Sequence, residues 1–187
     1  VGTIETAKQL IVAGAVEEQV LTGIERPILL GNRLPNAPVA PSVAPDNPYI
    51  GVMLPYTPLH YLLFFHPGAG GDYAFGKAVF TALVMTSGNI SEEPIAKDNG
   101  EAVERLNGIA DAFLVHNRPI HVRSDDSVIR VVNGEASFIR RSRGYVPSPV
   151  FLPEAVPVVL ALGAELKNTM CITQGRRAFT SQHIGDL

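Results

Sequence analysis

The sequence is poor in cysteine and aromatic residues and has no long apolar segment. Cys171 is the single cysteine among 187 residues, which excludes an intrachain disulfide and a zinc site built from several cysteines. No tryptophan is present, and no apolar run approaches the roughly 20 residues that cross a bilayer. The first residues, Val1-Gly2-Thr3, have neither the basic nor the apolar region of a signal peptide. We therefore expect a cytoplasmic protein that does not enter a membrane.

Two further absences concern metal binding and the start of the chain. The five histidines form no pair with the H-x-x-x-H spacing of a metal site, so we assign no metal site and expect no zinc in this chain. The sequence also begins without an initiator methionine. We expect it to be a processed or excised piece of a longer protein.

The charge is unevenly distributed along the chain. The net charge of −3 gives no global reason to expect a nucleic acid or an anionic membrane as partner. Residues 118–143 nevertheless hold six arginines against three carboxylates, and no lysine occurs between Asp98 and Glu165. Residues 91–111 are acidic instead. The arginine-rich segment is therefore the place to look for an anionic ligand.

The spacing of apolar residues predicts an α/β domain, because helix and strand patterns alternate. Helices are predicted over residues 3–11, 16–21, 59–65 and 99–110. Strands are predicted over residues 28–30, 49–54, 82–85, 111–115, 127–132, 136–140, 158–162 and 170–173. Prolines indicate an extended connection over residues 34–48 and a linker within residues 146–157. Asn133-Gly134 predicts a hairpin with a type I′ turn.

A glycine-rich segment looks like a phosphate-binding loop. Gly71, Gly76 and Lys77 match the spacing G-x-x-x-x-G-K, but Ala78 stands where a serine or threonine hydroxyl should bind magnesium. The segment also lacks the strand that precedes such a loop. We interpret it as a surface connection.

A cluster of small polar residues follows the predicted strand 82–85. Thr86-Ser87-Gly88-Asn89 is followed by a further hydroxyl at Ser91. Hydroxyls and exposed backbone N–H groups at the end of a strand can replace the hydration of an adenylate or phosphate. A polar turn that only satisfies its own backbone has the same composition. The residues alone leave both interpretations open.

The arginine-rich segment surrounds the predicted hairpin. Arginine suits phosphate because its planar fork donates two parallel hydrogen bonds, and the hairpin brings Ser127 close to Arg140 and Arg141. Asp125 and Asp126 could orient arginines, accept from a ribose hydroxyl or hold magnesium. A solvated, salt-bridged hairpin is the simpler interpretation of the same charges.

Several segments, in order, resemble the HypF family of carbamoyltransferases. They are residues 51–60, 85–91, 123–128, 140–147, 163–169 and 181–187. The resemblance implies an N-terminally truncated YrdC-like domain, with a twisted mixed sheet and flanking helices, over residues 1–148. It implies a linker over residues 149–157 and the first strands of an ASKHA-type carbamoyltransferase domain over residues 158–187.

The resemblance also implies an activity and its participants. HypF proteins use ATP and carbamoyl phosphate to make carbamoyl-adenylate, and Mg²⁺ is expected with the ATP. They pass the carbamoyl group to the C-terminal cysteine of HypE, on the route to the cyanide ligands of [NiFe]-hydrogenases. The upstream acylphosphatase and zinc-finger parts of the family, and the lysine- and arginine-rich start of the YrdC-like module, have no counterpart in this sequence.

The family's binding elements can be carried over to particular residues. Its relatives in threonylcarbamoyl-adenylate synthesis have a Ser-x-Asn-x-Ser element similar to Ser87, Asn89 and Ser91, so these residues and Thr86 are expected to line an adenylate pocket. Ser127, with Arg140 or Arg141, is expected to contact phosphate or the carbamoyl end. In the second domain, Lys167 and Asn168 resemble a first phosphate-contacting turn. No catalytic residue is assigned.

Two other functions remain open. YrdC-like folds resemble double-stranded-RNA binders, and the arginine-rich segment could serve that role. Synthesis of tRNA threonylcarbamoyl-adenylate would use the same pocket, but it leaves residues 163–169 and 181–187 unexplained.

Overall fold

The computed structural model describes residues 1–65, 80–91, 93–164 and 168–184. They form two compact units, one of residues 1–84 and 126–145 and one of residues 85–125 and 146–187. The glycine-rich segment from Gly71 to Ala78 and the predicted phosphate contact Lys167 lie outside the described residues.

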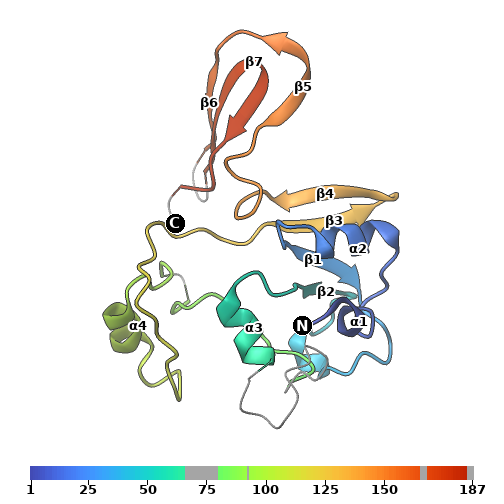
Figure 1. Cartoon of the computed structure of the whole chain (residues 1–187), viewed down its shortest axis with the longest axis vertical. Helices are drawn as coiled ribbons and strands as arrows, with labels where there is room; N and C mark the ends of the chain where they lie inside the picture. The colour runs from blue at the N-terminus through green and yellow to red at the C-terminus, as the bar shows by residue number, and fades with distance from the viewer. Residues whose placement is uncertain (66–79, 92, 165–167, 185–187) are drawn as a thin grey trace. The chain divides into compact units, whose positions relative to one another are not determined.

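The first unit is a four-stranded mixed sheet with helices beside it (Figure 1). Its elements are α1 (Ile4–Ala7), α2 (Ala15–Thr22), β1 (Ile28–Asn32), the 3₁₀ helix η1 (Pro41–Val43), β2 (Tyr49–Val52), α3 (Pro58–Phe64), β3 (Val128–Val132) and β4 (Glu135–Arg140). The strand order is β2-β1-β3-β4, with β1 and β3 parallel and the two outer pairs antiparallel. This confirms the predicted α/β fold with a mixed sheet and flanking helices.

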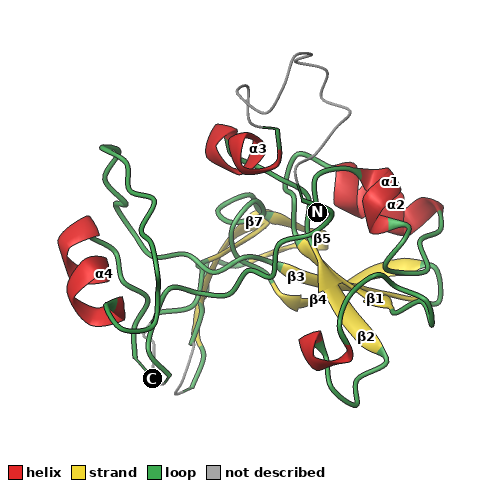
Figure 2. Ribbon diagram, turned by 90° about the horizontal axis from the view of Figure 1, so that it is seen from below, coloured by secondary structure: helices red, strands yellow, loops and turns green. Residues whose placement is uncertain are grey.

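The core of the first unit lies between the sheet and helices α1 and α2, which cover one of its faces (Figure 2). Leu29 on β1 and Ile129 on β3 are paired across the sheet and are almost fully buried. A Cβ atom at Gly31 would lie 2.6 Å from Cδ1 of Ile11, so glycine is required where this side chain crosses the strand. The remaining buried core residues are Ala7, Leu10, Leu21, Ile50, Val52 and Leu54.

The hairpin of β3 and β4 forms as predicted. Asn133 and Gly134 both have positive φ angles, 53° and 79°, as a type I′ turn requires. The turn joins Val132 to Glu135, which pair directly. The hairpin brings the start of β3 close to the end of β4, where the candidate arginines lie.

The second unit contains α4 (Asn99–Leu106) and a small antiparallel sheet of β5 (Val150–Val156), β6 (Leu160–Leu162) and β7 (Met170–Thr180), in the order β5-β7-β6. Strand β7 doubles back on itself. The N–H of Ser181 donates to the carbonyl of Met170 at 2.8 Å, and Asn168 bridges Ile184 in antiparallel register. Gly175, with φ 59°, lies at the bend.

Several sequence predictions were wrong or only partly right. Residues 82–85 and 111–115 are not strands, and Val84 and Leu114 are 72% and 63% exposed. A short apolar run forms a strand only where a neighbour can pair with it, and the described residues offer these runs no such neighbour. The helix predicted to reach Ala110 ends at Leu106, just before Gly108 with φ 98°. The segment interpreted as a linker contains strand β5, while the domain boundaries themselves stay predictions.

No helix within the described ranges is long and apolar enough to span a membrane.

Candidate functional site

The Thr86–Ser91 loop, in the second unit, is a turn held by its own side chains. The hydroxyl of Ser87 donates to Oδ1 of Asn89 at 2.5 Å. The carboxamide nitrogen of Asn89 donates to the carbonyls of Ile90 and Glu93, at 2.9 and 3.0 Å. Asn89 therefore organises the turn, while Thr86, Ser87 and Ser91 are exposed to solvent. The turn satisfies its own polar groups and also leaves three hydroxyl-bearing residues exposed, so the two interpretations of this motif are compatible.

An ion-pair network holds this loop against α4. Arg105 on α4 binds the carboxylates of Glu93 and Glu101 at 2.8 and 2.6 Å and the carbonyl of Pro94 at 2.7 Å. Arg123 donates to the carbonyl of Ile95 at 2.5 Å. The backbone N–H of Lys97 and the guanidinium of Arg105 lower the pKa of Glu101 from 4.5 to about 2. Two carboxylates of the acidic stretch, Glu93 and Glu101, thus take part in holding this segment against α4.

Ser127, which we expected at a phosphate, is fully buried in the first unit. Its hydroxyl accepts from the N–H of Ser142 at 2.8 Å and donates to the carbonyl of Arg143 at 2.9 Å. A ligand in solvent cannot reach this oxygen in the conformation described. Ser127 therefore joins the start of β3 to the segment after β4, and a direct phosphate contact by Ser127 is not what this geometry supports.

Arg143 belongs to the arginine-rich segment but was given no site role from the sequence, and its side chain makes several contacts in the first unit. Its Nε donates to Oδ1 of Asp126 at 2.5 Å, and its two terminal nitrogens donate to the carbonyls of Glu25 and Arg26, at 3.1 and 2.6 Å. Its guanidinium carbon lies 3.5 Å from the ring centroid of Tyr56. Of the three roles considered for Asp126, the structure shows the first, because this carboxylate orients an arginine.

Tyr56 and His60 continue the Arg143 cluster from the end of β2 into α3. The two rings meet edge to face with centroids 4.5 Å apart. Burial raises the pKa of Tyr56, and the nearby Asp126 raises it further. Burial lowers the pKa of His60, which favours the neutral imidazole. His60 thus packs against Tyr56 within the first unit.

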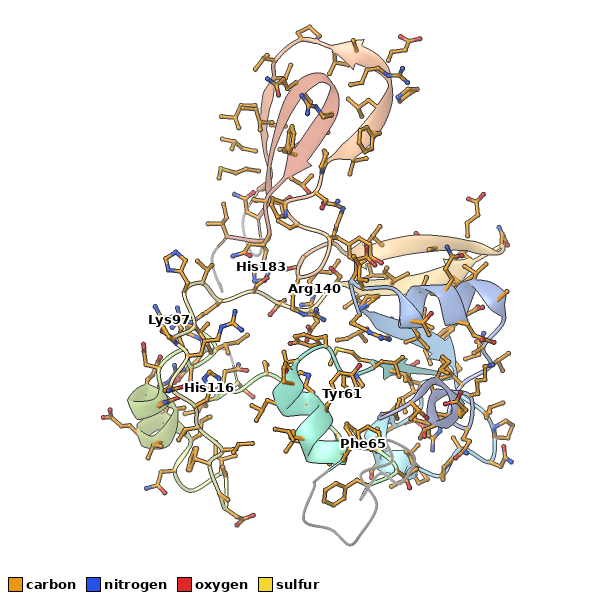
Figure 3. All side chains as sticks on the ribbon, viewed as in Figure 1. Tyr61, Phe65, Lys97, His116, Arg140 and His183 are labelled. Atoms are coloured by element: carbon orange, nitrogen blue, oxygen red, sulfur yellow. The ribbon has the colours of Figure 1, made fainter. Side chains whose placement is uncertain are left out.

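Arg140 and Arg141 lie where β4 ends, and Arg140 is labelled in Figure 3. The Nε of Arg140 donates to the carbonyl of Asp126 at 2.9 Å. The guanidinium of Arg141 lies 5.9 Å from the centroid of the Phe138 ring. Both side chains are partly exposed, so both remain able to meet a ligand from solvent.

The predicted pocket residues belong to different units. Thr86, Ser87, Asn89 and Ser91 lie in the second unit, and Ser127, Arg140 and Arg141 lie in the first. Within each unit the predicted residues are neighbours in space, as the contacts above show.

Asn168, at the start of the second sheet, has a buried side-chain oxygen. This Oδ1 atom finds no hydrogen-bond partner among the described residues. The loop is tight, because a Cβ atom at Gly163 would lie 2.6 Å from it. The carbonyl of Asn168 accepts from the N–H of Ile184 at 2.6 Å. An unpaired buried oxygen is costly, so the Oδ1 atom of Asn168 is suited to accept a hydrogen bond from a donor. The phosphate contact expected for Asn168 stays a prediction.

A cavity of about 210 Å³ opens beside the start of α4. Lys97 and His116, labelled in Figure 3, line it together with Arg118. The carboxamide of Asn99 donates to the carbonyl of His116 at 2.8 Å and fixes one wall. No local sequence pattern predicts this cavity, because the residues of its two walls are separated along the chain by α4.

Metal-binding side chains do not cluster in the part of the chain that the structure describes: no three His, Cys, Asp or Glu residues converge there. Asp125 lies 3.6 Å from Nε2 of His183 instead. Like Asp126, Asp125 therefore contacts a side chain of the protein itself.

Two family models match the chain. The Sua5/YciO/YrdC model, described as telomere recombination, matches residues 1–142. The model of the HypF Kae1-like domain matches residues 154–187.

Curated relatives match the chain along almost its whole length. The carbamoyltransferase HypF2 of Cupriavidus necator is 48% identical over 100% of this chain and 24% of its own length. The carbamoyltransferase HypF of Rhizobium leguminosarum is 44% identical over 98% of this chain and 24% of its own. The chain thus spans about a quarter of the length of these relatives.

Solved structures agree with the sequence matches. A crystal structure of full-length HypF in the phosphate- and nucleotide-bound form is 41% identical, with a TM-score of 0.78 over 100% of this chain and 28% of the other. The crystal structure of T. kodakarensis HypF is 40% identical, with a TM-score of 0.79 over 98% of this chain and 22% of the other. The chain belongs to the HypF family of carbamoyltransferases, and residues 1–142 are its Sua5/YciO/YrdC-type module.

Proposed function

We propose that this chain carries the nucleotide-binding part of a carbamoyltransferase that forms carbamoyl-adenylate from ATP and carbamate derived from carbamoyl phosphate. The observation that carries the proposal is the Ser-x-Asn turn in a chain that matches HypF proteins throughout. Thr86, Ser87 and Ser91 are exposed residues, while Asn89 holds the turn in shape. A related HypF structure is described as phosphate- and nucleotide-bound, which supports a nucleotide as the ligand.

Each predicted residue then has a role consistent with its contacts. Thr86, Ser87 and Ser91 would offer hydroxyls to the adenylate, and Asn89 would keep those hydroxyls in place. Arg140 and Arg141 would bind phosphate oxygens or the carbamoyl end. Ser127 would act indirectly, since its buried hydroxyl fixes the backbone of Ser142 and Arg143. Asn168 and Lys167 would serve a second phosphate contact.

The chemistry needs positioning and charge neutralisation more than a protein nucleophile. A carbamate oxygen forms a bond to the α-phosphorus of ATP while the bond from that phosphorus to the β-phosphate oxygen breaks, and pyrophosphate leaves. Arginines at the end of β4 would balance the charge of the phosphates in this step. Bound rigidly, the two reactants lose less entropy on reaching the transition state.

Mg²⁺ would accompany the ATP. The described residues bring no three carboxylate or histidine ligands together, so the ion would be held mainly by phosphate oxygens and water, as is common for Mg²⁺. When bound, it would neutralise part of the charge on the phosphates.

The carbamoyl group would then pass to a partner protein. We propose the C-terminal cysteine of HypE as the acceptor, whose sulfur would attack the carbamoyl carbon as AMP leaves. The product would serve the synthesis of cyanide ligands for [NiFe]-hydrogenases in the cytoplasm. The chain alone is expected to lack this complete activity, so detecting carbamoylation of HypE that depends on ATP, carbamoyl phosphate and this chain would contradict that expectation.

Calorimetric titration of ATP into the chain and its variants tests the nucleotide site. We expect Ser87→Ala and Asn89→Ala each to weaken ATP binding about tenfold, which corresponds to one lost hydrogen bond of about 1.4 kcal/mol. The matched control Asn107→Ala removes an exposed carboxamide of the same unit and should leave binding unchanged. Equal ATP binding by the wild type and both variants would reject the site.

The same variants separate the nucleotide site from the two other functions. A double-stranded-RNA binder would lose affinity steeply with added salt, because counterions are released when phosphates are neutralised. Changing Arg140 and Arg141 to alanine should weaken the binding of both RNA and ATP, whereas Ser87→Ala should weaken only the binding of ATP. The threonylcarbamoyl-adenylate alternative leaves the match of residues 154–187 to the HypF Kae1-like domain unexplained.

A further inference from the structure

A second cavity lies at the bend of β7, entirely within the second unit. Its volume is about 540 Å³, within the range of roughly 300–1,000 Å³ that is typical of small-molecule sites. The residues that line it are Phe151, Leu152, Gln174, Gly175, Arg176 and Arg177. None of the residues assigned to the adenylate contributes to it.

An irregularity in the pairing of β5 with β7 creates this cavity. Phe151 pairs with Arg177 and Val156 pairs with Gly175, so residues 152–155 lie opposite Arg176 alone. In a regular strand the side chains of Arg176 and Arg177 would point to opposite faces of the sheet. Bulges redirect side chains, and here both arginines line the same cavity.

The cavity wall is positively charged. Arg176 and Arg177 are the only charged residues that line it. The Nε of Arg176 donates to the carbonyl of Leu152 at 3.2 Å, and Arg177 donates to Oε1 of Gln174 at 3.3 Å. Within the described part of the chain neither arginine forms a salt bridge with a carboxylate. Most of their donors therefore remain available, in the fork geometry that binds phosphate and carboxylate.

The same wall offers an aromatic surface. Phe151 is 75% exposed although it is a large apolar side chain. An aromatic ligand could stack on this ring and remove both surfaces from water, while its anionic group meets the guanidinium groups. The cavity is thus apolar and cationic at once.

We propose that this cavity binds a small organic anion, a phosphate or carboxylate group carried on an aromatic body. This site is separate from the proposed adenylate pocket and takes a different ligand. The cation pair gives affinity for the anionic group, and Phe151 selects for an aromatic body.

Titration of the 187-residue chain, followed by two-dimensional NMR, tests this proposal with phenyl phosphate, benzoate and inorganic phosphate as probes. We expect phenyl phosphate or benzoate to bind saturably with a Kd of about 1 mM or below, and the tighter of the two identifies the anionic group. The double variant Arg176→Gln, Arg177→Gln should bind that probe at least about tenfold more weakly, because two charge-assisted contacts are lost. Arg118→Gln, which removes an exposed cation of the same unit away from this cavity, should bind as the wild type does.

Phe151→Ser tests the aromatic part separately. This variant should bind the aromatic probe about fivefold more weakly and should bind inorganic phosphate with unchanged affinity. The variants must retain the wild-type NMR spectrum elsewhere in the second unit. A second double variant, with Arg176→Lys and Arg177→Lys, keeps the charge and should bind with intermediate affinity. Absence of saturation by all three probes up to about 10 mM, or equal binding by the wild type and the glutamine variant, would overturn the proposal. ATP titration of the same samples reports on the adenylate pocket independently.

Discussion

Replacing the buried Ser127 by alanine should destabilise the first unit even when no ligand is present. The serine hydroxyl accepts from the N–H of Ser142 and donates to the carbonyl of Arg143, and both serines are almost fully buried. Alanine would leave a buried N–H without an acceptor, which costs about 1–3 kcal/mol. Because the Arg143 carbonyl also loses its donor, we expect a loss of about 2 kcal/mol in the free energy of unfolding.

Urea denaturation followed by tyrosine fluorescence measures this loss. All five tyrosines lie in residues 1–84 and 126–145 and no tryptophan is present, so the signal reports on the first unit. With a slope of about 2 kcal/mol per M, the midpoint should fall by about 1 M urea. Ser137→Ala, at an exposed position of β4, is the matched control and should stay within about 0.5 kcal/mol of the wild type. A Ser127→Ala midpoint equal to that of Ser137→Ala would refute the assignment of Ser127 as a structural residue.

Three further perturbations test the contacts around the candidate site. Arg143→Lys keeps the charge but loses most of the hydrogen bonds to Asp126, Glu25 and Arg26. We expect the free energy of unfolding, measured by urea denaturation, to fall by about 2 kcal/mol. An unchanged urea midpoint would contradict the role of the planar guanidinium. Gly144→Ala should cost more than about 2 kcal/mol in a thermal melt, since φ is 88° and the new Cβ would collide with the Glu25 carbonyl oxygen. A variant as stable as the wild type would contradict this requirement for glycine. The pKa of Glu101 is lowered from 4.5 to about 2, so its contribution to stability is complete above pH 4.5 and is lost as the pH falls towards 2. Glu101→Gln should remove that part of the pH dependence, and NMR titration of the Glu101 carboxyl should give a midpoint well below 4.5.

Local sequence patterns predicted those parts of the fold that depend on local geometry. The Asn133-Gly134 turn and its two strands follow from residues that tolerate positive φ between alternating apolar positions. The same holds for the helix start at Asp98, where the side chain of Glu101 caps the first turn. Residues 82–85 were predicted wrongly because an apolar run does not reveal whether a partner strand lies beside it.

The organisation of the arginines could not be predicted from the sequence. Arg143 binds Asp126, 17 positions earlier, and the carbonyls of Glu25 and Arg26, 118 and 117 positions earlier. The sequence does not distinguish the six arginines of this segment, because their contacts with backbone carbonyls depend on the tertiary fold. Ser127 illustrates the same limit, because a serine that begins a strand looks alike whether its hydroxyl faces a ligand or the backbone of a neighbouring segment.

Titration of the wild-type chain with ATP and GTP tests the proposed nucleotide site most directly. We expect saturable ATP binding, with GTP binding at least about tenfold more weakly, because a site that pairs with one base leaves polar groups unpaired against the other. Equal affinity for the two nucleotides, or no ATP binding, would contradict it.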